Sequence, residues 1–224
     1  MNSRGLAIKA AAEFIGTAFL LIAVVGSGIA AQRLSPHDVG IELFENSTAT
    51  GAALVAIILA LGPVSGAHLN PAVSAASRLL ARMSTKEMFV FWIAQLAGAA
   101  AGTVIANLMF GLPAVEISSK VRFGTGLWLG EVIATFGLVL VIFTVIHSGQ
   151  LTSVAVAVGA YIAGAYWFTS STSFANPAVT LARTLTQSFA GIAPGSVAPF
   201  LIAELLGALA AVVTLRLLYP ASRK

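Results

Sequence analysis

Six apolar runs separated by short polar segments make up the hydrophobic pattern of this chain. They cover residues 6–30, 47–61, 86–110, 126–147, 151–168 and 197–219. A helix needs roughly 20 predominantly apolar residues to cross a hydrocarbon core, and the first, third, fourth and sixth runs reach that length. The second and fifth runs are shorter. We therefore predict six membrane-spanning helices of unequal length.

Two further stretches, residues 71–81 and 177–187, are moderately apolar but at about ten residues too short to span. Each follows one copy of the tripeptide Asn-Pro-Ala, at Asn70-Pro71-Ala72 and at Asn176-Pro177-Ala178. Backbone at membrane depth must bury its polar groups in protein or line a cavity. The pattern therefore predicts two re-entrant half-helices.

The two halves of the chain resemble each other. Residues 12–17 match residues 130–135 at a spacing of 118, residues 93–98 match 202–207 at a spacing of 109, and the Asn-Pro-Ala copies lie 106 apart. Each half, at about 6–110 and 124–219, holds three spans and one half-helix, and an odd number of spans makes the repeat inverted. We predict one domain over residues 1–224, with half-helices that enter from opposite sides of the membrane.

Composition supports an all-α integral membrane protein. The chain is 58% hydrophobic and 9% charged, with a mean hydropathy of +0.95, far outside the soluble range. It has no Cys and three His, so we expect no metal site, cofactor or catalytic thiol. The first run contains Glu13 and is too long for a signal-peptide core, so we interpret it as a span.

Charge placement predicts the orientation. The net charge of +4 would suggest nucleic acid for a soluble protein, but the basic residues lie between the apolar runs, so we expect no nucleic-acid partner. Cytoplasmic segments collect Lys and Arg, and eight against four favour cytoplasmic termini. The inner set is Arg4, Lys9, Arg78, Arg82, Lys86, Arg216, Arg223 and Lys224, and the outer set is Arg33, Lys120, Arg122 and Arg183.

The Asn-Pro pairs carry the candidate chemistry. Pro favours the first position of a helix, and the residue before it is disfavoured in helical geometry. The Asn side-chain oxygen caps the helix start, which leaves its NH2 group as a donor. Two opposed helix starts place two positive dipole ends and two amides near the midplane. Such a point orients the oxygen of a water or polyol and opposes cations.

With these motifs, the chain resembles the major intrinsic protein family, the aquaporins and aquaglyceroporins, over nearly its whole length. The resemblance also rests on residues 65–73 (SGAHLNPAV), 12–17 (AEFIGT) and 145–147 (VIH). It implies six tilted helices and two half-helices per protomer, a homotetramer in membrane lipid, and one pore in each protomer. His68, beside the first Asn-Pro-Ala, is a candidate for lining that pore.

Glu13, Glu131 and Glu204 are carboxylates inside predicted spans. Glu13 and Glu131 occupy matching positions in the repeat, and such residues are candidates for a proton relay. The resemblance implies another role, in which they accept hydrogen bonds from the backbone of the re-entrant loops. Glu204 stands where the first half has Gln95, and packing, a helix–helix hydrogen bond and a transport role are all open for it.

The family spacing places a selectivity filter at Thr50, Gly164, Ser173 and Val179. Members of the family usually have Arg directly after the second Asn-Pro-Ala, where this chain has Val179. Four small residues imply a wide, weakly polar and uncharged filter. A Val filter resembles bacterial inner-membrane members associated with arsenic resistance, which implies passage of neutral metalloid hydroxides such as arsenite, with glycerol and urea as other candidates.

Several alternatives remain open at this level. A one-residue shift would put Phe174 against the pore in place of Ser173 and leave a water-selective channel. Arg183, one helical turn after Val179, would either restore positive charge at the outer mouth or serve a lipid-interface or loop-capping role. Inverted repeats also build secondary transporters, although the two repeat-matched Glu are the only candidate coupling groups. A structural membrane protein is the third class, and the polar Asn pair argues against it.

Overall fold

The computed structural model describes residues 3–150 and 153–220. Its elements are helices joined by loops: α1 (Ser3–Leu34), α2 (Val39–Ser65), α3 (Pro71–Leu79), α4 (Thr85–Met109), α5 (Thr125–His147), α6 (Ser153–Phe168), α7 (Pro177–Ala182), η1 (Arg183–Leu185), η2 (Pro194–Ser196) and α8 (Val197–Leu218). Arg223 and Lys224, the side chain of Arg4 and the predicted start of the fifth run at Leu151 lie outside the described residues.

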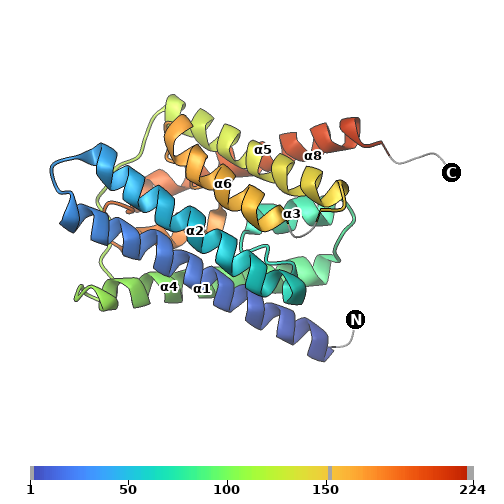
Figure 1. Ribbon diagram of the computed structural model, residues 1–224, viewed down its shortest axis with the longest axis horizontal. Helices are drawn as coiled ribbons and strands as arrows, with labels where there is room; N and C mark the ends of the chain where they lie inside the picture. Colours follow the sequence, from blue (N-terminus) through green and yellow to red (C-terminus); the bar gives the residue numbers. More distant parts are fainter. Residues whose placement is uncertain (1–2, 151–152, 221–224) are drawn as a thin grey trace.

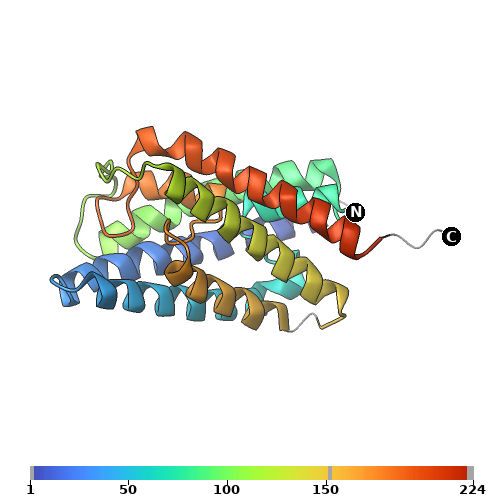
Figure 2. The same cartoon turned by 90° about the horizontal axis from the view of Figure 1, so that it is seen from above.

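The helices form a bundle in which each half repeats the packing of the other. α1 packs on α2 and α4, and α5 packs on α6 and α8, while α2 and α6 join the halves. α1 and α5 run in opposite directions, and α1 starts on the same side of the molecule as α8 ends (Figure 1). Seen from above, α8 (red) runs along one side of the bundle and α2 (blue to cyan) along the opposite side (Figure 2). This is the arrangement of an inverted repeat.

Five helices within the described ranges are long and apolar enough to cross a membrane: α1, α2, α4, α5 and α8. The remaining span is α6, which corresponds to the fifth apolar run. It has 16 residues and extends over about 24 Å, less than the hydrocarbon thickness of about 30 Å. The short fifth run is therefore a short helix.

The second span is much longer than its apolar run predicts. α2 has 27 residues and starts after Asp38, whose side chain caps it through the N–H of Ile41. Its first turns carry polar side chains that lower the hydropathy but are satisfied in the bundle. Asn46 is buried and donates to the carbonyl oxygen of Val24 at 2.9 Å and to Ser27 Oγ at 2.8 Å. Polarity at this end therefore marks contacts between helices, not the end of the helix.

The half-helices are shorter than predicted. α3 ends at Leu79, two residues before the expected boundary, and the stretch predicted to extend to 187 is divided between α7 and the 3-10 turn η1. The η1 segment is held by the loop before α5, because Ser118 N–H donates to the Thr184 carbonyl and Glu116 N–H to the Leu185 carbonyl. This pairing takes carbonyl oxygens that a longer α-helix would use internally.

Two glycines at matching positions of the repeat make close helix contacts. A Cβ built on Gly98 of α4 would lie 2.3 Å from the Phe14 carbonyl oxygen of α1, and one on Gly207 of α8 would lie 2.4 Å from the Val132 carbonyl oxygen of α5. Only glycine permits this approach. Small residues drive such contacts in lipid, where helices gain little from hydrophobic burial against each other.

Candidate functional site

The two half-helix starts meet in the middle of the bundle and are joined by reciprocal hydrogen bonds. Asn70 Nδ2 donates to the carbonyl oxygen of Ala175 at 2.7 Å, and Asn176 Nδ2 donates to that of Leu69 at 2.8 Å. Each Asn also caps its own helix, since Oδ1 accepts from the N–H of Ala72 in one case and Ala178 in the other. One N–H of each amide therefore ties the loops together, and the second is left for the cavity.

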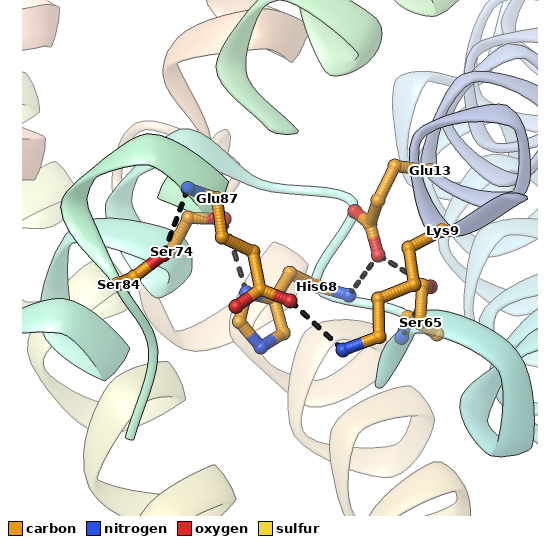
Figure 3. Close-up of polar contacts among 8 residues, drawn as sticks. Lys9, Glu13, Ser65, His68, Ser74, Ser84 and Glu87 are labelled. Atoms are coloured by element: carbon orange, nitrogen blue, oxygen red, sulfur yellow. Dashed lines mark hydrogen bonds and ion pairs between the residues drawn. The ribbon is translucent and has the colours of Figure 1, made fainter. Parts of the chain in front are cut away.

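Glu13 of α1 holds the loop before α3. Its Oε1 accepts from His68 N–H at 2.9 Å and from Ser65 Oγ at 2.6 Å, and its Oε2 accepts from Leu69 N–H at 2.7 Å. Figure 3 shows the first two of these contacts converging on the carboxylate. The side chain is fully buried. These contacts are what a loop-support role requires, because buried N–H groups without acceptors are costly.

Glu131 of α5 makes the same contacts with the loop before α7. Its Oε1 accepts from Phe174 N–H at 2.9 Å and its Oε2 from Ala175 N–H at 2.7 Å, and Ser171 also bonds to its carboxyl group. The donors lie 106 residues after those of Glu13, so the repeat extends to individual hydrogen bonds. Both carboxylates are occupied by backbone donors.

The third member of each cluster differs between the halves. In the first half, Gln95 Nε2 donates to Glu13 Oε2 at 2.8 Å and to Ser74 Oγ at 3.1 Å. In the second half, Glu204 contacts Glu131 carboxyl to carboxyl and accepts from Thr180 Oγ1 at 2.5 Å. Its Oε1 also accepts from Asn176 N–H at 3.3 Å. Glu204 is thus a helix–helix and loop contact.

The two loops share an unusual backbone. Gly66, Ala67 and Leu69 in the first loop have positive φ angles, as do Thr172, Ser173 and Ala175 in the second. Five of these six residues carry a side chain, and such residues are uncommon in the left-handed region. The Glu13 and Glu131 contacts hold this conformation, which directs the Leu69 and Ala175 carbonyls across to the Asn amides.

A cavity of about 160 Å³ is lined by both Asn side chains, and this volume is roughly tenfold the space that one water needs. We call the part lined by His68 the His68 end and the part lined by Arg183 the Arg183 end. Apolar side chains of α5 and α6 form much of the wall, including Ile142, Val158 and Ile162. The polar groups are few and come mainly from the two loops and the half-helices.

At the His68 end, the imidazole Nδ1 lies 3.1 Å from Ser74 Oγ, and the ring packs edge-on against Phe91. Lys9 and Glu87 form an ion pair of 2.8 Å nearby, as Figure 3 shows. His68 lines the cavity.

Three of the four predicted filter residues line the cavity, and the fourth does not. Thr50, Ser173 and Val179 are among the lining residues, whereas Gly164 lies on the exposed face of α6. Tyr166 lines the cavity in its place, and its hydroxyl lies 3.3 Å from Thr50 Oγ1. The prediction that Gly164 lines the pore is therefore corrected. The helical period explains the error, because Val158, Ile162 and Tyr166 share one face of α6.

Ser173 and Phe174 both line the cavity, so the two alternatives for this position are not exclusive. Ser173 Oγ is buried without a hydrogen-bond partner among the described residues. The Phe174 ring packs edge-on against Phe200, with centroids 5.1 Å apart. This end of the cavity therefore has hydroxyl groups and aromatic faces together.

Arg183 is 2% exposed and lines the cavity, which excludes the lipid-interface role. Its Nε donates to the carbonyl oxygen of Ala190, so it does hold a loop. Arg122, in the loop before α5, donates to the carbonyl oxygens of Gly191 at 2.9 Å and Phe189 at 3.2 Å. Burial lowers the pKa of Arg122 to about 10, and this side chain therefore stays protonated at neutral pH.

Two features of the site are not predicted by the sequence patterns above. Tyr166 could have been found from the i, i+4 series on its helix, in which Gly164 is out of phase. The Gln95 contact with Glu13 required knowledge that α1 and α4 pack together, although the match between Gln95 and Glu204 was visible in the repeat.

Comparisons with known proteins agree with this geometry. Residues 2–150 match the family model described as MIP: Major intrinsic protein. The chain is 50% identical over 222 residues to aquaglyceroporin AqpS of Rhizobium meliloti (strain 1021), covering 99% of this chain and 94% of that protein. It is 32% identical to aquaporin NIP1-4 of Oryza sativa subsp. japonica, covering 85% and 75%.

Among solved structures, the chain is similar to the aquaglyceroporin from Plasmodium falciparum. The TM-score is 0.75 with 23% identity, and the match covers 96% of this chain and 98% of that one. At this identity the match shows the fold.

Proposed function

The chain belongs to the major intrinsic protein family, whose members are membrane channels for water and small neutral solutes and not enzymes, and we propose that its pore passes neutral solutes larger than water. The observation that carries this proposal is Val179, which lines the cavity directly after the second Asn-Pro-Ala. A valine there leaves open the space that an arginine would fill.

The chemistry of the Arg183 end favours solutes that have both hydroxyl groups and an apolar side. Thr50 and Ser173 offer hydroxyl groups, and Tyr166 and Phe174 offer aromatic faces along the same cavity. A polyol can place its oxygens on the first set and its C–H groups on the second. Glycerol fits this description, and the name of the 50% identical relative, aquaglyceroporin, supports it. Arsenite, as neutral As(OH)3, is a second candidate of similar polarity.

Several further features belong to the same proposal. We place the filter at Thr50, Tyr166, Ser173 and Val179, and the midplane barrier at Asn70 and Asn176. The protein acts as one channel domain in each protomer of a homotetramer in a bacterial inner membrane. Both termini are cytoplasmic, which is supported by Lys9, Arg78 and Arg216 near one end of the bundle and Arg33 and Lys120 near the other.

A water-selective channel is the second candidate function, and one observation favours it. Tyr166 and Phe174 are large, and both line the cavity near Val179. If the two rings close the gap, water alone passes.

Proteoliposomes that carry the full chain distinguish the two candidates. When external glycerol is raised suddenly, vesicles first shrink and then reswell as glycerol enters. With a wide filter, reswelling is faster than in empty vesicles. Arsenite uptake is measured in the same preparation. The proposal is contradicted if water flux is rapid but glycerol and arsenite enter no faster than they enter empty vesicles. That result supports the water-selective candidate.

A further inference from the structure

The position that carries the filter cation in the family is apolar here, yet a buried cation lines the same cavity one turn away. Arg183 follows Val179 by four residues, which corresponds to about 6 Å along a helix. Both residues line the cavity, and Arg183 is 2% exposed. Charged side chains are almost never this buried unless they are paired, so the partners of Arg183 decide what its charge does.

The groups in contact with Arg183 fix its position and carry no net charge, while the Glu131 and Glu204 carboxyl groups act on it electrostatically without forming an ion pair among the described residues. Its Nε donates to the Ala190 carbonyl, and its guanidinium carbon lies 3.5 Å from the centroid of the Phe174 ring. A carbonyl oxygen and an aromatic face attract a cation but carry no net charge. Among the described residues the one ion pair is Lys9–Glu87, near His68. Within the same ranges, no hydrogen-bond partner is found for the terminal amino groups of Arg183.

Arg122 offers a matched comparison. Its guanidinium carbon lies 5.0 Å from the centroid of the same Phe174 ring, and it has two carbonyl partners at Phe189 and Gly191. It is not among the residues that line the cavity. Two cations therefore share one aromatic ring, but Arg183 alone of the pair faces the path of the solute.

We propose that Arg183 determines charge selectivity at this end of the pore, where it repels cations from a position one helical turn beyond Val179. Selection by size and selection by charge then depend on different residues. Val179 leaves room for a neutral solute, while Arg183 supplies the fixed positive charge, whose field is strong because the surroundings exclude water. The inference rests on the proposed function of the pore and adds the residue that prevents a wide pore from leaking cations.

Modification of an introduced thiol tests the role of the Arg183 charge, because the charge can be restored after the variant has folded. The chain has no Cys, so Arg183→Cys introduces a single thiol. Proteoliposomes are assayed for Na⁺ uptake and glycerol uptake before and after treatment with methyl methanethiosulfonate, which adds a neutral group, or 2-aminoethyl methanethiosulfonate, which adds an ammonium group. We expect the ratio of Na⁺ to glycerol flux to rise at least about tenfold in the untreated variant. The ammonium reagent lowers the ratio again, and the neutral reagent does not.

Arg122→Leu is the control, and its ratio of Na⁺ to glycerol flux should equal that of the unsubstituted chain. The proposal is overturned if Arg183→Cys conducts Na⁺ no better than the unsubstituted chain, or if both reagents act alike. A thiol that neither reagent modifies, as judged by mass, also overturns it, because the side chain then does not face the cavity.

A second variant covers the case in which Arg183→Cys does not assemble. Arg183→Gln keeps an N–H donor for the Ala190 carbonyl and removes the charge, and the same rise in the flux ratio is expected, with Arg183→Lys close to the unsubstituted chain. The proposed function fails separately, and visibly, if the unsubstituted chain conducts no glycerol.

Discussion

The loop before α3 and the loop before α7 have the same hydrogen-bonded backbone but differ in the side chains around it. In both, a buried carboxylate accepts two backbone N–H groups at 2.9 and 2.7 Å, and an Asn amide reaches a carbonyl of the opposite loop. Even the residue after each Asn-Pro-Ala is the same, since Val73 matches Val179. The hydrogen-bonded frame therefore follows the repeat.

The differences lie around this frame. His68 of the first loop matches Phe174 of the second, and Gln95 behind the first carboxylate matches Glu204 behind the second. The first pair changes what the solute meets at each end of the cavity, and the second changes how each carboxylate is held. The frame therefore sets the position of the pore, whereas the residues outside it set selectivity and local stability.

The largest stability effect is expected for the first carboxylate. Glu13→Gln keeps the volume but replaces an acceptor oxygen with an NH2 group that faces buried donors, at a cost of about 2–4 kcal/mol. Glu131→Gln should cost less, because the new amide can donate to Glu204. Unfolding free energies in detergent test this. Equal costs, or a larger cost at Glu131, contradict the assigned difference between the halves.

The residues behind the two carboxylates, Gln95 and Glu204, can be exchanged between the halves. Gln95→Glu removes the donor to Glu13 and places two carboxyl groups together, so we expect a loss of about 1–3 kcal/mol. Glu204→Gln gives the second half the pair of the first and should change stability by less than about 1 kcal/mol. The same unfolding measurement applies. A loss of more than about 1 kcal/mol for Glu204→Gln would show that the second half requires a carboxyl group at this position, where an amide does not suffice.

The two Asn substitutions are expected to cost less than Glu13→Gln, and their two costs should be equal. Asn70→Ala and Asn176→Ala each remove a helix cap and one cross-loop hydrogen bond, for about 1–2 kcal/mol. Thermal unfolding of both variants in the same detergent measures it. If one substitution proves neutral while the other is costly, the two loops do not hold each other as described.

The repeat made much of the fold predictable. Glu13 and Glu131 stand at matching positions, and so do the Asn-Pro-Ala copies, so the sequence alone indicated two half-helices and the carboxylates behind them. The start of α2 was missed because Glu42 and Asn46 are polar, although both are buried.

The filter was only partly predictable, because counting back from Asn176 assumes a fixed path for the loop that follows α6. Three positive φ angles in that loop change its path, and the phase of the helix then selects Tyr166 over Gly164. The position of Arg183 depends on the 3-10 turn after α7 and on the carbonyl of Ala190. Neither the turn nor the hydrogen bond to Ala190 is indicated by the local sequence.

In the proposed function, Val179 leaves the pore open to neutral solutes larger than water. The most direct test is the ratio of glycerol to water permeability in proteoliposomes, for the unsubstituted chain and for Val179→Arg, with Val179→Leu as a control for added bulk without charge. We predict that Val179→Arg lowers the ratio at least about tenfold while water flux largely remains, and that Val179→Leu lowers it less. An unchanged ratio in Val179→Arg would contradict the claim and locate the constriction elsewhere.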